Sequence, residues 1–177
     1  MKNSGTKLTI ILLLFTFCVA CQKDLLETSP KDQINNSSFW KTKQDAVNAV
    51  NALYPFLPDY TEVDWDRMTD IATTNIPSQA TVTIEKGEHD ASLPYFKVKW
   101  NDGYKAIRAA NYFLENADRV KQADATMDET TLTRLKSEAR FIRAFSYVRL
   151  IMLFGDVPLI TKTIDITEAK SVSRTPK

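Results

Sequence analysis

Two long stretches of the sequence carry large apolar residues at the spacing of an α-helix, and this pattern decides the class of fold. In the first stretch such side chains recur three or four residues apart, at Trp100, Tyr104, Ile107, Asn111 and Leu114. That spacing lines one face of a helix for about four turns. Asn101, Asp102 and Gly103 are typical of a turn, but the pattern continues on both sides of them, so one helix is predicted. For Asn111 we favour a buried amide bonded to nearby backbone, with a ligand contact as the alternative.

The second stretch predicts a helix that opens with Thr126 and Glu129 in capping-box spacing and runs to about Phe154. Gly155, with Pro158 beyond it, ends the pattern. The apolar positions are Leu132, Leu135, Ala139, Ile142, Phe145, Val148 and Met152. The basic positions, expected on a solvated or ion-paired side or alternatively on a partner-binding face, are Arg134, Lys136, Arg140, Arg143 and Arg149. Joined by a short polar link, the two helices should form an antiparallel hairpin.

A shorter helix is predicted where Thr42 and Asp45 have capping-box spacing. Its apolar face carries Val47, Val50, Leu53 and Tyr54, and Pro55 and Pro58 end it. Phe39 and Trp40 precede the cap and are expected to pack in the core, with sugar contact as the alternative. Residues 60–96 then lack sustained periodicity, so we expect a long irregular connection with short strands around residues 81–84. Connections this long within compact domains are often functional.

The first 20 residues have the charge and length pattern of a signal peptide, with Lys2 and Lys7 ahead of an apolar run that ends at Ala20. That run is too short to span a membrane, which takes about 20 apolar residues. Val19, Ala20 and Cys21 resemble a bacterial lipobox, so we expect cleavage after Ala20 and a lipid on Cys21. The alternative is ordinary secretory cleavage, with Cys21 as a free thiol. Residues 21–36 are then the lipidated N-terminus and tether, and residues 37–177 the helical domain.

The charge balance excludes one class of partner. Residues 1–20 hold two of the 23 basic residues and no acid, so 21 basic and 22 acidic residues remain beyond them. A nucleic-acid-binding surface needs an excess of Lys and Arg to neutralise phosphates. We therefore expect no nucleic-acid partner.

The sequence contains few residue patterns that indicate a catalytic or a metal-binding site. Asp64, Asp66 and Asp70 have part of the spacing of a calcium loop, but Thr69 and Asn75 stand where that loop needs Gly and Glu. A looser calcium site remains the alternative. The chain has one histidine, which leaves no zinc ligand set and no usual catalytic triad. Carboxylate pairs for glycoside hydrolysis can be nominated, Asp66 with Asp70 or Glu85 with Glu88, but their sequence context indicates no cleft. We expect neither a catalytic nor a metal site.

Three groups of residues together resemble one known family. The first group is Cys21, Leu25, Leu26 and Glu27, and the second is Trp100, Tyr104, Ile107 and Asn111. The third and most specific group runs from Glu138 through Arg143 to Gly155, Asp156, Val157, Pro158, Leu159 and Ile160. With these residues the chain resembles the SusD/RagB family of outer-membrane nutrient-binding lipoproteins. The resemblance implies a mainly α fold of tetratricopeptide-like helical hairpins with a long irregular insertion. Family members are much longer, so we expect an incomplete fold that is marginally stable or self-associating when alone.

The resemblance also implies a function. A lipoprotein of this family sits at the outer face of the outer membrane and captures nutrient glycans for import through a SusC-like TonB-dependent transporter, without catalysis or cofactor. Lys23 and Asp24, next to the lipidated cysteine, fit that location. The alternative is a helical adaptor that assembles with the transporter and binds no ligand itself.

Sugar binding needs an aromatic face and a few amide or carboxylate groups. The irregular stretch offers Tyr60, Trp65, Asp66, Asp70, Asn75, Gln79 and Tyr95. From these we nominate Trp65, Asp66, Asp70 and Asn75 as ligand-binding residues. The alternative for Trp65 is packing on the helical hairpin.

Overall fold

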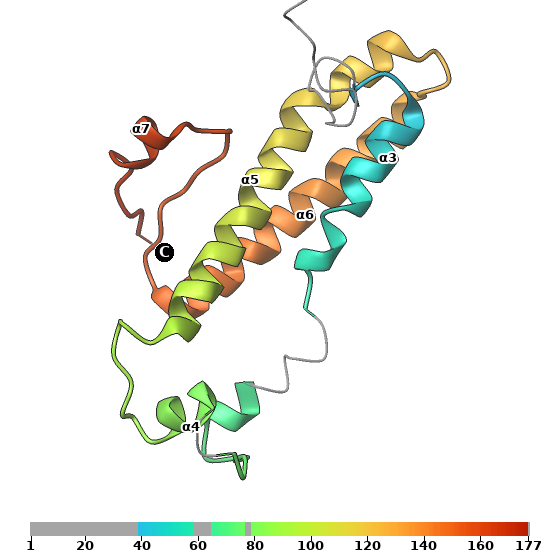
Figure 1. Cartoon of the computed structure of the whole chain (residues 1–177). Helices are drawn as coiled ribbons and strands as arrows, with labels where there is room; N and C mark the ends of the chain where they lie inside the picture. The colour runs from blue at the N-terminus through green and yellow to red at the C-terminus, as the bar shows by residue number, and fades with distance from the viewer. Residues whose placement is uncertain (1–38, 59–64, 77–78, 177) are drawn as a thin grey trace, which may run out of the picture. The chain divides into compact units, whose positions relative to one another are not determined.

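The computed structural model describes residues 39–58, 65–76 and 79–176, which belong to one compact unit that begins at Phe39 (Figure 1). Its named elements are α3 (Lys43–Asn51), the 3-10 helix η2 (Tyr54–Phe56), α4 (Ala80–Glu85), α5 (Pro94–Ala123), α6 (Glu129–Phe154) and α7 (Ile166–Ala169). Within the described ranges the only β-type pairing is a single bridge between Val157 and Thr175. The predicted signal peptide, the lipidated Cys21 and the tether, like Tyr60 and Asp64, lie outside the described residues.

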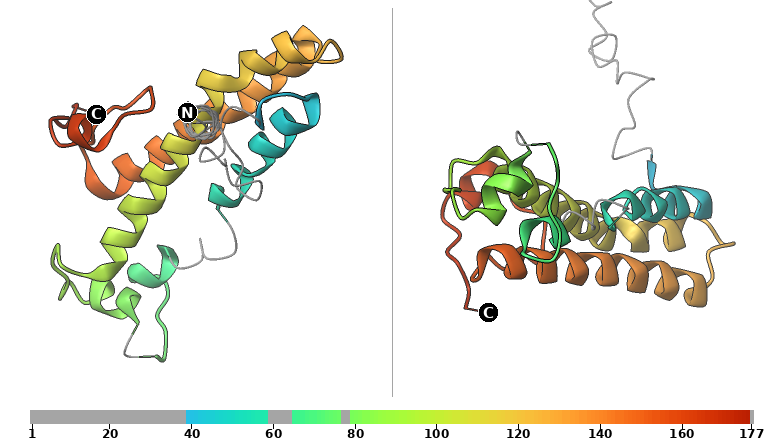
Figure 2. Two further views of the ribbon diagram at one scale, coloured as in Figure 1. Left: turned by 45° about the horizontal axis from the view of Figure 1, so that its top comes forward. Right: turned by 90° about the horizontal axis from the view of Figure 1, so that it is seen from below.

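The two long helices α5 and α6 lie side by side and antiparallel, and their shared face holds most of the core (Figures 1 and 2). From α5 it buries Ala106, Ile107, Ala110, Phe113, Ala117 and Val120. Gly103 lies within α5 and forms no turn. A Cβ at this position would stand 2.8 Å from the Leu150 side chain. The glycine therefore permits close helix packing. The predicted uninterrupted helix is confirmed, but it begins earlier, at Pro94, a residue that suits the first turn of a helix.

The start of α6 differs from the prediction. Asp128, not Thr126, caps the helix, and its Oδ1 accepts a bond from the Thr131 backbone N–H at 2.7 Å. Thr126 instead bonds to Asp124 in the connecting turn, through its backbone N–H at 2.9 Å and its hydroxyl at 2.7 Å. Two neighbouring residues were suitable caps, and spacing alone favoured the wrong one. The predicted end is confirmed, because Gly155 adopts a φ of 68°, which glycine tolerates readily.

The apolar residues of α6 fall on two faces. The face against α5, called the inner face below, carries Leu132, Leu135, Ala139, Ile142, Ser146 and Leu150. Val148 and Met152, two of the predicted apolar positions, are 53% and 66% exposed and lie outside the core. The helical period that runs through Ile142 continues to Ser146 and Leu150, whereas Val148 and Met152 follow a different row along the helix.

The helix α3 packs against one end of the hairpin (Figure 1). Its predicted capping box is confirmed, because Thr42 accepts a bond from the Asp45 backbone and Asp45 accepts one from the Thr42 backbone. Trp40 is 4% exposed and its ring lies 6.0 Å from that of Phe113, which confirms its core role. Tyr54, predicted on the apolar face, is 45% exposed and donates its hydroxyl to Glu138 at 3.0 Å.

The strands predicted around residues 81–84 are wrong, because this segment forms the short helix α4. Thr81 and Val82 are adjacent and both buried, which is not the alternation of a strand. The Lys86 backbone N–H donates to the Val82 carbonyl at 3.1 Å, as in a helix. β-branched residues favour a strand only where a neighbouring strand pairs with it, and none of the described segments does so.

Candidate functional site

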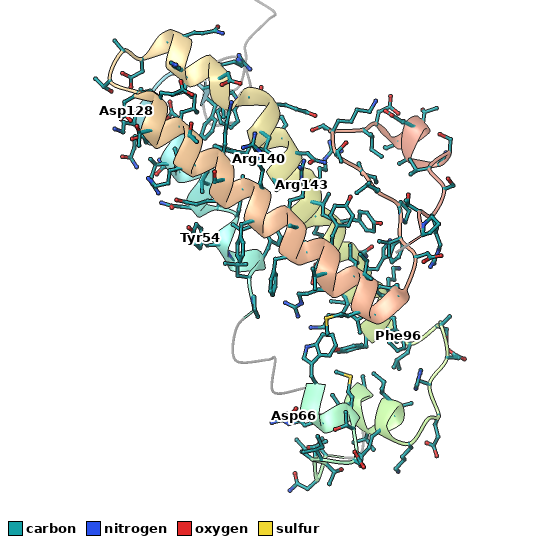
Figure 3. The ribbon with its side chains drawn as sticks, turned by 180° about the vertical axis from the view of Figure 1, so that it is seen from behind. Tyr54, Asp66, Phe96, Asp128, Arg140 and Arg143 are labelled. Carbon is teal, nitrogen blue, oxygen red and sulfur yellow. The ribbon has the colours of Figure 1, made fainter. Side chains whose placement is uncertain are left out.

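The four nominated ligand-binding residues lie on one segment, residues 65–76. Trp65 opens a short 3-10 turn over residues 65–68 and is half-buried, whereas Asp66, Asp70 and Asn75 are exposed. Figure 3 places Asp66 beside the short helices, well away from Arg143 on the long hairpin. The segment thus offers one partly covered aromatic ring and three accessible polar side chains, the groups that sugar binding requires.

Local hydrogen bonds hold this segment in shape. The Asp66 carbonyl accepts bonds from the Thr69 backbone N–H at 3.2 Å and the Thr69 hydroxyl at 2.8 Å. Further along, the Thr73 hydroxyl donates to Glu85 of α4 at 2.9 Å. No described residue bonds to the carboxylates of Asp66 and Asp70, so their oxygens are available to hydroxyl groups of a ligand.

Two other candidates from the irregular stretch lie at the starts of helices. Gln79 occupies the N-cap position of α4. Tyr95 is half-buried, with its ring 5.7 Å from that of Phe96 and the Lys99 ammonium 5.3 Å from its centroid. The single histidine, His89, also packs against Phe96, with 5.5 Å between ring centres. Among the described residues no three acidic, Cys or His side chains gather where they could hold a metal ion.

The most extensive polar network of the hairpin surrounds Asn111, which is fully buried on α5. Its Nδ2 donates to the carbonyl oxygens of Ile160 and Lys162 at 3.0 Å each. Its Oδ1 accepts a bond from Arg143 of α6 at 2.7 Å, and Arg143 also donates to the Thr161 carbonyl at 3.3 Å. This confirms the buried, backbone-bonded amide, although the backbone comes from a segment about 50 residues further along the chain.

Further side chains of the two helices hold the same segment, residues 157–164, which we call the clamped segment. The Tyr147 hydroxyl donates to the Ile160 carbonyl at 2.9 Å and accepts from the Ile160 N–H at 2.6 Å. The Tyr104 hydroxyl donates to the Pro158 carbonyl at 2.8 Å. Burial is the main cause of a raised pKa at both Tyr104 and Tyr147, so both stay neutral donors.

The basic residues of α6 divide between these roles. Arg134 pairs with Glu138 and Lys136 pairs with Asp118, which fits the expected ion-paired side. Arg143, predicted to share that side, turns towards the clamped segment instead. Its position one turn before Tyr147 was the available signal, because residues four apart share a face of a helix.

Three hollows lie along the hairpin. One, of about 370 Å³, is lined by Pro55, Phe56, Leu57 and Pro58, in and just after η2, and by Lys99, Asp102, Gly103, Ala106, Ser146, Arg149, Leu150 and Leu153. A second, of about 320 Å³ and mostly apolar, lies between α5 and the chain that follows residue 157. The third adjoins η2 and Phe141. None of the three includes a nominated residue. Of the helices in the described ranges, none is both long and apolar enough to cross a membrane.

A helical hairpin that clamps its own following segment, with short helices inserted before it, defines a mainly α-helical protein of the tetratricopeptide-like class. The sequence pattern of the SusD-like family, described as starch-binding proteins associating with the outer membrane, matches residues 24–175. The chain therefore belongs to the SusD-like family, as the resemblance predicted. Much of the residue pattern that indicated the family serves to hold the clamped segment on the two long helices. This holds for Tyr104, Asn111 and the block Val157–Ile160.

Known relatives agree with this assignment. The SusD-like protein P2 of Formosa agariphila is 30% identical over 185 residues, which cover 97% of this chain and 34% of the relative. The SusD-like protein P25 of the same bacterium is 29% identical over 179 residues, which cover 93% of this chain and 33% of the relative. The chain thus spans about a third of the length of these curated relatives.

Solved structures share the fold. A SusD-like protein from Bacteroides fragilis superposes with a TM-score of 0.69 at 23% identity, covering 84% of this chain and 28% of that protein. A laminarin-binding SusD-like protein gives a TM-score of 0.67 at 24% identity, covering 77% of this chain and 30% of that protein. The predicted mainly α, tetratricopeptide-like fold is confirmed.

Proposed function

We propose that this chain belongs to a non-catalytic lipoprotein that captures nutrient glycans at the cell surface for import through a TonB-dependent outer-membrane transporter. The observation that carries the proposal is the family match over residues 24–175, because that family is described as starch-binding and associated with the outer membrane. The similarity to a laminarin-binding protein of the same fold supports a glycan ligand. The chain spans about a third of the length of the curated relatives it matches.

For the ligand we propose contacts from Trp65, Asp66, Asp70 and Asn75. Three of these side chains are exposed, and the half-buried Trp65 presents part of an aromatic surface. A pyranose ring packs its apolar side against such a surface, and the amide and carboxylate groups bond to its hydroxyls. The bond between Thr73 and Glu85 braces the segment, which lowers the entropy lost on binding.

For the anchor we propose cleavage after Ala20 and acylation of Cys21. Each buried CH₂ of an acyl chain contributes about 0.8 kcal/mol to membrane binding, so two or three chains hold a folded domain at the surface without a spanning helix. The test is metabolic labelling of expressing cells with palmitate. The precursor should incorporate label, and Cys21→Ser should abolish it. Labelling of the Cys21→Ser chain would contradict this anchor without affecting the proposed ligand.

A second function, that of a helical adaptor, is favoured by one observation. The most extensive polar network of the hairpin, formed by Asn111, Arg143 and Tyr147, points inward to the clamped segment. It therefore stabilises the fold and does not offer these groups to a ligand. In this case the chain assembles with the transporter and binds no ligand itself.

The discriminating experiment is electrophoresis of residues 22–177 through native gels that contain laminarin, starch or another polysaccharide. Glycan capture predicts retarded migration in at least one gel and normal migration after Trp65→Ala. Phe141→Ala is the matched control, because it removes an aromatic ring that is 63% exposed on α6, outside the nominated segment. Unretarded migration in every gel, together with co-purification with the transporter, would establish the adaptor instead.

A further inference from the structure

The two aspartates nominated for the ligand lie on one short turn of the chain. Asp66 belongs to the 3-10 turn over residues 65–68, and Asp70 follows four residues later. The Thr69 hydroxyl holds the turn between them, because it donates to the Asp66 carbonyl at 2.8 Å and accepts from the Ile71 backbone N–H at 3.2 Å. Both aspartate side chains are exposed, so their carboxylates face the ligand that the segment meets.

Further acidic side chains occupy the part of the chain between this turn and α5. The Thr73 hydroxyl donates to Glu85 at 2.9 Å, which brings the carboxylate of Glu85 on α4 against the same segment. Beyond α4, Asp90 accepts two bonds from Ser92, one from its hydroxyl at 2.6 Å and one from its backbone N–H at 2.8 Å. These bonds lower the pKa of Asp90, so it stays ionised at neutral pH.

Basic side chains are few in the same part of the chain. Between residues 65 and 93 the acids are Asp66, Asp70, Glu85, Glu88 and Asp90, and the Lys and Arg residues are Arg67 and Lys86. Arg67 is half-buried and already has an interaction partner. Figure 3 shows Arg140 and Arg143 on the long hairpin, apart from Asp66. The nominated segment therefore lies in a part of the protein with net negative charge.

A charge of this sign discriminates between classes of glycan. A carboxylate accepts hydrogen bonds from the hydroxyl groups of a neutral sugar. The ionised carboxylate of a uronic acid, or a sulfate ester, has no proton to donate and carries the same charge, so it is repelled. Proteins that bind such anions meet them with Arg or Lys, often in bidentate pairs. Among the described residues 65–76 Arg67 is the one side chain of this kind.

We infer that the nominated segment takes uncharged glycans, and that Asp66 and Asp70 exclude glycans that carry carboxylate or sulfate groups. The inference rests on the proposed glycan capture, to which it adds the class of sugar and the two side chains that select it. Both aspartates then have two roles, as acceptors for sugar hydroxyls and as charges that repel anions.

The test compares neutral polysaccharides with their own charged derivatives. Oxidation of the C6 hydroxyls of laminarin, soluble starch or galactomannan to carboxylates adds negative charge and keeps the linkages of the backbone. Native gels that contain each form over a range of concentrations measure its affinity for residues 22–177 and for the Trp65→Ala variant. The difference between these two chains is the binding that depends on the segment, because a polyanion can also attach to the basic side chains of α6.

We expect oxidation to weaken this Trp65-dependent binding by at least about 10-fold at low salt, and added salt to narrow the ratio because it screens the repulsion. Asp66→Asn combined with Asp70→Asn should narrow the ratio at least about 5-fold, since an amide still bonds to hydroxyls but carries no charge. The matched control is Glu129→Gln combined with Glu168→Gln. It removes the same charge from α6 and α7, where both acids pair with lysines, and should leave the ratio unchanged.

Two results would overturn the selection by charge and leave glycan capture intact. The first is Trp65-dependent binding of an oxidised polysaccharide that equals or exceeds the binding of its neutral parent. The second is a loss on oxidation that neither salt nor the double asparagine variant relieves, because the missing C6 hydroxyl would then explain it. Absence of Trp65-dependent binding to every neutral and oxidised form would instead overturn the proposed glycan capture, and this inference with it.

Discussion

Replacing Asn111 by alanine removes the amide that ties the clamped segment to α5. The side chain is fully buried and makes two bonds to backbone carbonyls and one to the Arg143 guanidinium. A neutral hydrogen bond contributes about 1 kcal/mol and a bond to a charged group about 2 kcal/mol, so the loss should be about 4 kcal/mol. Small domains have a free energy of unfolding of only about 5–15 kcal/mol, which makes this a large fraction of the total.

Urea denaturation of residues 22–177, followed by far-UV circular dichroism, measures this loss. Asn116→Ala is the matched control, because Asn116 lies on the same helix and bonds locally, to the Tyr112 carbonyl and to Arg119. Alanine favours a helix, so this control should change the free energy of unfolding by less than about 0.5 kcal/mol. If both variants unfold at the same urea concentration, or Asn111→Ala loses less than about 1 kcal/mol, the clamp does not stabilise the fold as argued.

Three further predictions concern single contacts. Gly103→Ala should destabilise the hairpin by about 1–3 kcal/mol in the same denaturation, because its Cβ meets the Leu150 side chain at 2.8 Å. The cost of Gly103→Ala should be smaller when it is measured in a Leu150→Ala background, and strict additivity of the two losses would refute the contact. Hydrogen bonds from the backbone and side chain of Thr131 lower the pKa of Asp128 in the folded state, so the stabilisation by the Asp128 carboxylate is full above about pH 4 and is lost as the pH falls further. The difference in Tm between wild type and Asp128→Asn should shrink over that range, and a constant difference would contradict this stabilisation. Tyr147→Phe should lower the free energy of unfolding by about 2 kcal/mol, since two hydrogen bonds to the clamped segment are lost. It should also speed hydrogen exchange in that segment, while exchange in α3 stays unchanged.

Local sequence signals were sufficient for the long helices. The periodic row from Trp100 to Leu114 continues past a turn-like triplet, and the structure confirms one helix there. Local rules failed where two solutions fit equally well. Thr126 and Asp128 both suit a cap, and only the turn formed by Asp124 decides between them. Pro94 marked the true start of α5, but the irregular pattern before it hid this signal.

Long-range contacts were harder to predict. The apolar positions predicted on α6 divide between the buried inner face and exposed positions such as Val148 and Met152, and composition alone cannot separate the two groups. The burial of Asn111 followed from its place on the apolar row, but its partners at residues 160 and 162 could not be foreseen, because hydrogen bonds across about 50 residues depend on the whole fold. For the same reason the nominated ligand residues rest on chemistry and exposure, since sequence does not specify how an irregular segment folds.

The most direct test of the proposed glycan capture is calorimetric titration of residues 22–177 with soluble oligosaccharides of the polysaccharide that retards it most. Glycan capture predicts saturable heat that Trp65→Ala removes and Phe141→Ala leaves unchanged. Heat that persists in Trp65→Ala would contradict the nominated segment. Absence of heat with every oligosaccharide would contradict glycan capture by this chain.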